Sequence, residues 1–259
     1  MTVKRLFRGG LLRIVAAPTQ GDGGAMDQAV FHLINQQWTS PALDLFMAAV
    51  SDVQIWMPLL VVLGLSALIF LGFRGRAFVF CLAVTLLISD VFVVRALKAS
   101  IMRPRPKQAQ TVRMVQLQKA SPKFLTLLKQ PTIRFSSERD RRNSGSSFPS
   151  GHVADNVIVA IFCMLFFRRW GWLYCVFAAA VAYSRVYLGA HWPSDVLATA
   201  LLAAGEGLLM LALLEFLWRR IGPRMMPAVF ARHPWLVLEP APVAALVRPV
   251  SQVEDLRHP

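Results

Sequence analysis

The chain has 259 residues, of which 56% are hydrophobic and 16% are charged, whereas about a quarter of the residues in a globular protein are charged. This composition is typical of a membrane protein and excludes a disordered chain and a soluble β-sandwich. The 28 Lys and Arg residues exceed the 14 Asp and Glu residues by 14, which indicates anionic headgroups or phosphates as partners and no nucleic acid.

The first 25 residues carry four basic side chains, namely Lys4, Arg5, Arg8 and Arg13. Arg13 interrupts what would be the apolar core of a signal peptide, so we expect no cleaved signal and a cytoplasmic N-terminal segment at 1–25. Polar residues also interrupt the next stretch, 26–50. It is predicted to be either a short first span or a pair of interfacial helices.

Five further runs are apolar enough to cross the hydrocarbon core, which takes about 20 helical residues. They cover Ile55 to Phe73, Ala77 to Leu97, Val153 to Phe167, Gly171 to Leu188 and Asp195 to Trp218. With the stretch at 26–50 counted as a sixth, the sequence predicts an all-α polytopic membrane bundle of about six transmembrane helices. This membrane domain is expected to cover residues 26–221.

An extended loop, 103–148, separates the third and fourth spans. A connection of this length is either functional or partly structured. Ser121 is an N-cap signal and Pro122 suits a first helical turn, so we expect a short interfacial helix at 122–130. After the last span, the proline-rich tail at 222–259 shows no apolar periodicity and is expected to be disordered.

The three cysteines, Cys81, Cys163 and Cys175, all lie inside apolar runs. None belongs to a CxxC pair and none lies near a pair of histidines. The sequence therefore predicts neither a zinc site nor a disulfide framework. We expect no metal and no cofactor.

Three polar clusters lie at the ends of the predicted spans. Counting crossings places all three on the same face of the membrane, so that one pocket can hold them. The first cluster is Lys98 with Arg105, the second is Ser150, Gly151 and His152, and the third is Arg185, His191 and Asp195.

The residue types in these clusters suit a phosphoryl group. Lys98, Arg105 and Arg185 supply three cations, and guanidinium groups bind phosphate oxygens in bidentate fashion. Ser150 and Gly151 stand where a helix begins, and there the free backbone N–H groups and the positive end of the helix dipole favour an anion. The sequence therefore predicts a phosphate-binding site at this face.

Two histidines complete the predicted site. Asp195 stands four residues after His191 and is expected to accept a proton from one imidazole nitrogen, which leaves the other nitrogen nucleophilic. His152 can then protonate the leaving oxygen. Taken alone, Lys98 and Arg105 also fit side chains that snorkel at a membrane boundary, so it is the joint pattern that indicates catalysis.

Three motifs match without a gap or a substitution: K-x6-R-P at 98–106, P-S-G-H at 149–152 and S-R-x5-H-x3-D at 184–195. In these motifs the chain resembles the type 2 phosphatidic acid phosphatase superfamily, and the resemblance covers roughly residues 55–218. It implies a six-helix membrane bundle and a metal-independent phosphatase with a phosphohistidine intermediate.

The resemblance also implies how the site residues divide the reaction. It makes His191 the nucleophile, Asp195 its orienting partner and His152 the general acid. The remaining five residues would form the phosphate cradle: Lys98, Arg105, Ser150, Gly151 and Arg185.

We therefore expect an integral membrane phosphatase that hydrolyses a phosphomonoester or pyrophosphate of a membrane lipid. Undecaprenyl pyrophosphate, lipid A, phosphatidylglycerophosphate and phosphatidic acid all satisfy the motifs, and an envelope lipid such as undecaprenyl pyrophosphate or lipid A is the preferred interpretation. Two alternatives stay open: a phosphotransferase that passes the group to a second lipid, and a non-catalytic lipid-binding protein.

The orientation in the membrane does not follow from charge, because the 28 Lys and Arg residues divide equally between the two predicted faces. The arginines of the short loops at 74–76 and 168–169 have no part in phosphate binding, and relatives in bacteria usually face the periplasm. We expect a bacterial inner-membrane protein with its site facing the periplasm or the exterior. A cytoplasmic N-terminus then requires six crossings, which favours a span at 26–50.

Overall fold

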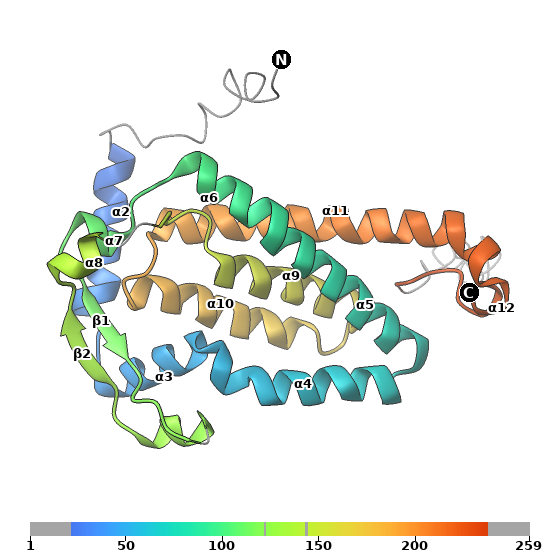
Figure 1. The fold of residues 1–259 in the computed structure, drawn as a ribbon, viewed down its shortest axis with the longest axis horizontal. Coiled ribbons are helices and arrows are strands. Elements are labelled where there is room, and N and C mark those ends of the chain that lie inside the picture. The colour runs from blue at the N-terminus through green and yellow to red at the C-terminus, as the bar shows by residue number, and fades with distance from the viewer. Residues whose placement is uncertain (1–21, 122, 143–144, 238–259) are drawn as a thin grey trace, which may run out of the picture.

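The computed structural model describes residues 22–121, 123–142 and 145–237. Residues 1–21 of the predicted N-terminal segment and residues 238–259 of the predicted tail lie outside this part of the chain. The described residues are mostly helical, and the long helices run side by side (Figure 1). They are α4 (Val53–Phe70), α5 (Gly72–Ile88), α9 (Gly151–Phe166), α10 (Trp172–Tyr187) and α11 (Pro193–Met225).

The second of these long helices extends beyond α5. It continues through a π-helical segment, η3 (Ser89–Val94), into α6 (Arg95–Ile101). Three helices in the described residues are long and apolar enough to cross a membrane: Val53–Phe70, Gly72–Ala109 and Pro193–Met225. Most side chains of α4 are exposed although the helix is almost entirely apolar, as expected for a helix that faces lipid. The predicted helical membrane bundle is confirmed.

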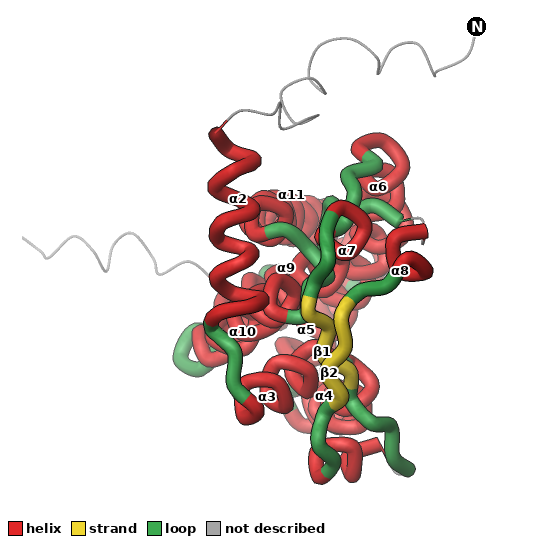
Figure 2. The backbone as a smooth tube through the Cα atoms, turned by 90° about the vertical axis from the view of Figure 1, so that its left-hand side faces the viewer, coloured by secondary structure: helices red, strands yellow, loops and turns green. Residues whose placement is uncertain are grey.

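The stretch at 26–50 forms two helices and not one continuous span. α2 (Asp22–His32) runs into a π-helical segment, η2 (Leu33–Gln37), and α3 (Pro41–Ser51) begins anew after Ser40. Ser40 caps α3 with its side chain, and the proline that follows suits a first helical turn. α2 crosses one end of the bundle (Figures 1 and 2), whereas α3 packs along α10.

The loop predicted at 103–148 is folded. It contains a two-stranded antiparallel hairpin in which Arg113 pairs with Phe135 and Gln116 pairs with Thr132. The segment predicted as a helix at 122–130 lies between the two strands and forms a 3-10 helix in place of an α-helix. In chain order the elements are α7 (Pro106–Ala109), β1 (Arg113–Gln116), η4 (Lys123–Leu128), β2 (Thr132–Phe135) and α8 (Glu138–Arg142).

Buried polar contacts fix this hairpin to the bundle. The amide nitrogen of Asn35 donates to the carbonyl oxygens of Arg113 (2.9 Å) and Tyr187 (2.7 Å), and its amide oxygen accepts from the Arg113 N–H (3.1 Å). The Arg113 side chain pairs with Asp44 at 2.5 Å. β1 is therefore tied to η2, α3 and α10, and the hairpin is a fixed part of the fold.

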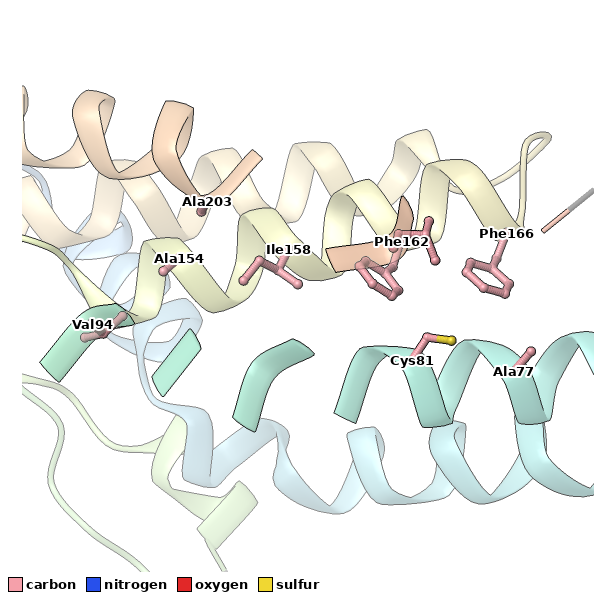
Figure 3. Close-up of a cluster of buried hydrophobic side chains, with 9 residues drawn as sticks. Ala77, Cys81, Val94, Ala154, Ile158, Phe162, Phe166 and Ala203 are labelled. Atoms are coloured by element: carbon pink, nitrogen blue, oxygen red, sulfur yellow. The ribbon is translucent and has the colours of Figure 1, made fainter. Parts of the chain in front are cut away.

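The largest cluster of buried apolar side chains lies between α5, α9 and α11 (Figure 3). Phe162 and Phe166 of α9 face Cys81 and Ala77 of α5, so Cys81 packs as an apolar residue. A second cluster lies at the end of the bundle that α2 crosses, and it packs Phe31 of α2 against Trp192 with ring centroids 5.2 Å apart.

The prediction of a disordered tail from residue 222 is wrong for residues 222–237. α11 continues to Met225, α12 (Pro227–Arg232) follows, and the chain then packs back on α11, where the Leu236 N–H donates to Glu215 (2.9 Å). The prolines favoured a disordered tail in the sequence interpretation. Pro227 is nevertheless compatible with a helix, because it occupies the first turn of α12, where no N–H group is needed.

Gly189 allows α10 and the hairpin to approach closely. Its φ is +72°, and a Cβ at this position would lie 3.1 Å from Cγ2 of Val112 and 3.2 Å from the carbonyl oxygen of Arg113. Gly189→Ala is therefore expected to lower the free energy of unfolding by about 1–3 kcal/mol through backbone strain and displacement of the hairpin. Thermal unfolding of the purified protein in detergent measures this.

Gly205→Ala in α11 is the matched control, because a Cβ there meets nothing within 4 Å. Alanine is a better helix former than glycine by about 1 kcal/mol, so this variant is expected to keep or raise the unfolding temperature. Equal unfolding temperatures for the two variants would contradict the close approach at Gly189.

Candidate active site

The three predicted clusters meet at the end of the bundle that α2 crosses. Lys98 lies in α6 and Arg105 immediately precedes α7, while Ser150 is the N-cap of α9. Arg185 lies in the last turn of α10, and His191 lies in the turn before α11. The charges of Arg185, Arg105 and Lys98 all act on His191, so the three cations lie near this imidazole.

His191 is buried and oriented by a backbone group. Its Nδ1 lies 2.5 Å from the carbonyl oxygen of Ser147. Since a carbonyl oxygen only accepts, Nδ1 carries the proton and Nε2 keeps its lone pair. Burial and then the nearby Arg185 guanidinium lower the pKa of His191 to about 3. The imidazole is therefore neutral at physiological pH, as a nucleophile must be.

Asp195 does not contact His191 as the sequence analysis expected. Its carboxylate accepts hydrogen bonds from Ser147 Oγ (2.5 Å) and Arg103 Nη1 (2.5 Å), and it is buried. A spacing of four residues brings two side chains together on one helical face only where both lie in the helix, and α11 begins only at Pro193. His191 precedes the helix, so the two side chains do not share a helical face. The expected hydrogen bond is wrong: within the described residues Asp195 is connected to His191 through Ser147 and through the N–H of the adjacent Trp192, which donates to Asp195 (3.3 Å).

Ser147, which the sequence analysis missed, connects three parts of the site. It is fully buried. Its N–H donates to the carbonyl oxygen of Arg103 (2.7 Å), its hydroxyl donates to Asp195, and its carbonyl oxygen accepts from His191. Arg103, Asp195 and His191 are thereby held in one geometry. No spacing in the sequence could indicate this, because Ser147 precedes the second motif.

Arg103 and Asp27 extend this network to α2. Arg103 Nη2 pairs with Asp27 at 2.7 Å, and Asp27 also accepts from the N–H of Ser194 (2.9 Å). Asp27 is 7% exposed, although it lies on a helix that crosses the bundle end. The R-P-R-P run at 103–106 was the available signal for Arg103, whereas nothing in the local sequence marks Asp27.

The start of α9 presents polar groups toward the same region. Ser150 is fully buried, its N–H donates to Thr199 Oγ1 (3.1 Å), and its hydroxyl has no partner in the described residues. The N–H groups of Gly151 and His152 precede the first intrahelical hydrogen bonds of α9. Thr199 occupies the N–H of Ser150, so the N–H groups of Gly151 and His152 are the ones that this helix start offers to an anion.

The guanidinium groups are held by neutral oxygens and not by carboxylates. Arg185 Nη1 donates to Ser51 Oγ of α3, and its Nε is buried without a partner in the described residues. Arg105 Nε donates to the carbonyl oxygen of Ser146 (3.4 Å). Both cations keep their full charge for an anion, in contrast to Arg103, which two carboxylates neutralise.

The surroundings of His152 differ from those of His191. His152 is exposed, and it lines a cavity of about 580 Å³ together with Ser51. The cavity volume lies within the usual range for small-molecule sites. The cavity adjoins the cluster of cations through His152 and through Ser51, which holds Arg185.

A model of the PAP2 superfamily matches residues 77–219, which is more than half of the chain. The chain belongs to this superfamily. Membership confirms the resemblance seen in the three motifs, and together with the apolar helices it makes the protein a membrane lipid phosphatase. A phosphohistidine intermediate is the general mechanism of PAP2 members.

Two curated relatives share sequence with this PAP2 member to different extents. A lipid A 4′-phosphatase of Bacteroides thetaiotaomicron is 28% identical over 178 residues, which cover 65% of this chain and 68% of that protein. An undecaprenyl-diphosphatase of Sulfolobus acidocaldarius is 42% identical over 59 residues, which cover 22% of this chain and 29% of that protein. The second match therefore spans less than a third of its relative.

Two crystal structures share the PAP2 fold. LpxE of Aquifex aeolicus superposes with a TM-score of 0.53 at 23% identity, covering 72% of this chain and 95% of that one. A PAP2-type phosphatidylglycerolphosphate phosphatase of Bacillus subtilis gives a TM-score of 0.50 at 20% identity, covering 76% and 89%. At these identities the likeness establishes the fold alone.

The lowered pKa of His191 predicts how stability depends on pH. Below pH 6.5 the unfolded chain binds a proton at this residue, whereas the native protein does so only near pH 3. The free energy of unfolding is therefore expected to fall as the pH drops from 6.5 toward 3. Between pH 7 and 5 the wild type should lose roughly 1–2 kcal/mol more than His191→Gln, which lacks the titrating group.

Unfolding in detergent across this pH range measures the difference between the two proteins. His233→Gln, which replaces an exposed histidine next to α12 at the opposite end of the bundle, is the control and should follow the wild type. Parallel pH profiles for the wild type and His191→Gln would show that His191 is not buried as a neutral imidazole.

Proposed function

We propose that this protein hydrolyses a phosphate ester or pyrophosphate of a membrane lipid, with His191 as the nucleophile. One observation carries the proposal: a neutral imidazole has its Nδ1 held by Ser147, and the charges of Lys98, Arg105 and Arg185 act on it, the two arginines being held by neutral oxygens within the described residues. Relatives named as lipid A and undecaprenyl diphosphate phosphatases support a lipid of the cell envelope as the substrate class.

In the proposed reaction the lone pair of His191 Nε2 attacks phosphorus, and the bond from phosphorus to the leaving oxygen breaks. The electron pair passes to that oxygen, which takes a proton from His152. Water then attacks the phosphohistidine, the electron pair of the P–N bond returns to Nε2, and His152 takes back a proton from the water. Inorganic phosphate and the dephosphorylated lipid are the products.

The phosphate cradle stabilises the negative charge of the phosphoryl group during transfer. Lys98, Arg105 and Arg185 lie around His191, and the N–H groups of Gly151 and His152 begin α9. Donors preorganised in this way are each worth about 3–4 kcal/mol of transition-state stabilisation. We expect turnover to continue in EDTA because these residues supply the positive charge.

We further propose that five helical segments cross the membrane: α4, α5 together with α6, α9, α10 and α11. Asp27 ties α2 to the site, so residue 22 lies at the same end of the bundle as His191. This count replaces the six crossings inferred from the sequence. The short connections at the far end carry arginines, a pattern of cytoplasmic loops, and support a site that faces away from the cytoplasm.

The two histidines are expected to respond differently to the leaving group. His152→Ala should lower turnover of a lipid phosphomonoester by about 10²–10⁴-fold. On p-nitrophenyl phosphate its loss should be much smaller, because that leaving group needs no proton. His191→Ala should abolish phosphate release from both substrates, since no nucleophile remains.

Release of inorganic phosphate by the purified variants in detergent measures both effects. If His191→Ala kept the parental rate, the nucleophile would be assigned wrongly. Equal losses for His152→Ala on the two substrates would remove the general acid from the mechanism.

The contacts of Arg103 and Asp27 support a positioning function for both. Through Asp195 and Ser147 they hold the carbonyl oxygen that orients His191. Asp27→Asn is expected to lower kcat by about 10–100-fold, because small displacements of a nucleophile are costly, while KM changes little.

Asp140→Asn is the matched control for Asp27→Asn. Asp140 is about as buried as Asp27. It lies in the folded loop at 103–148, where it pairs with Arg134 at 2.6 Å and makes no hydrogen bond or ion pair with Ser147 or Asp195 among the described residues. This variant should keep the parental kcat. Steady-state kinetics compare the two, and an equal fall in kcat would show that Asp27 acts only through general stability.

A further inference from the structure

The cavity beside the phosphate cradle lies between two parts of the fold. One wall is the junction of α3 and α4, and the other is β1 with the residues that follow it. The lining residues are Ala48, Ser51, Asp52, Val53, Gln54, Val115, Gln116, Leu117, Lys119, His152 and Leu188.

We propose that this cavity receives the leaving group of the reaction, and that the leaving group is a neutral, hydroxyl-bearing headgroup and not a second phosphate. The inference rests on the proposed function, whose site it deepens. It assigns the substrate as the phosphomonoester of a polyol or sugar headgroup, as opposed to a pyrophosphate.

The position of His152 indicates what enters the cavity. In an in-line displacement the leaving oxygen departs on the side opposite the attacking nitrogen, where the general acid must reach it. His152 lines the cavity, whereas His191 is buried and does not. Ser51 also lines it and holds Arg185, so the cavity opens directly beside the cradle. The group that leaves with the ester oxygen therefore extends into this cavity.

The charge of the cavity differs from that of the cradle. Asp52 and Lys119 are its two charged lining residues besides the imidazole, and they carry opposite charges. The cradle, by contrast, gathers three cations around His191. A second phosphate placed in the cavity would gain no net attraction and would lie near the Asp52 carboxylate. A neutral headgroup meets no such penalty.

The polar groups of the cavity suit hydroxyls. Asp52 Oδ1 accepts from the Gln54 N–H (2.9 Å) and caps α4, while Oδ2 makes no hydrogen bond within the described part of the chain. Gln54 is exposed and presents a carboxamide, which both donates and accepts, while Gln116 presents its amide nitrogen because its oxygen accepts from the Arg134 guanidinium. A carboxylate oxygen with two carboxamides can pair with several hydroxyls, whereas a phosphate offers only acceptors.

The walls of this cavity are preformed. β1 is pinned by Asn35 and by the pair between Arg113 and Asp44, and Val115 and Gln116 of that strand line the cavity. A fixed wall discriminates between headgroups better than a mobile loop, because binding costs less ordering entropy.

Asp52→Asn tests the inference with four lipids in detergent. Dodecyl glucoside 6-phosphate and lipid A 4′-monophosphate have neutral, hydroxylated leaving groups, phosphatidic acid has one without a free hydroxyl, and the leaving group of farnesyl pyrophosphate carries a phosphate. The wild type is expected to show a kcat/KM about tenfold or more higher on the first two. Asparagine keeps the oxygen that caps α4, so the variant isolates the charge.

In Asp52→Asn the ratio of kcat/KM on lipid A 4′-monophosphate to that on farnesyl pyrophosphate is expected to fall about tenfold. Gln54→Ala, which truncates an exposed side chain, should lower kcat/KM on the hydroxylated lipids alone. Glu138→Gln makes the same chemical change at an exposed site on α8 outside the cavity and should leave the ratio unchanged.

The outcomes separate this inference from the proposed function. If the wild type releases phosphate but prefers farnesyl pyrophosphate, or if Asp52→Asn and Gln54→Ala both leave the ratios unchanged, the assignment of the cavity is overturned and the phosphatase remains. If the wild type releases phosphate from none of the four lipids, the proposed function itself is overturned.

Discussion

The hydrogen bond between His191 Nδ1 and the carbonyl oxygen of Ser147 is the contact on which the chemistry of this protein depends. It fixes which imidazole nitrogen carries the proton and where the other nitrogen points. A backbone carbonyl has no net charge, so it orients the ring without favouring the imidazolium as a carboxylate would. His191, the proposed nucleophile, therefore stays neutral near several cations.

The arginines of the site fall into two sets: one that is paired with carboxylates and one that, in the described part of the chain, is not. Arg103 is neutralised by Asp27 and Asp195, and this ion-pair group maintains geometry. Within the described residues the guanidinium groups of Arg105 and Arg185 donate to neutral oxygens, so their charge is available to the proposed phosphoryl group. Removing one carboxylate from the first group would leave a buried charge uncompensated, which is costly. The two groups lie side by side and remain distinct in function.

The sequence was informative where contacts are local and uninformative where they are distant. The helices and the three motifs could be predicted because apolar run length and short spacings are local properties. The hairpin could not, because its four-residue strands show no decisive pattern and it is fixed by Asn35, which precedes β1 by 78 residues. The contact expected between His191 and Asp195 failed because the start of α11 lies between them.

The lengths of α9 and α10 have a consequence for the lipid around the protein. Each helix has 16 residues and is therefore about 24 Å long, less than the roughly 30 Å of a typical hydrocarbon core. In the proposed arrangement of five spans, a bilayer becomes thinner next to these helices. His152 and Arg185, at the ends of the two helices, then lie at the level of the lipid phosphates, and a substrate can meet them without leaving its own leaflet.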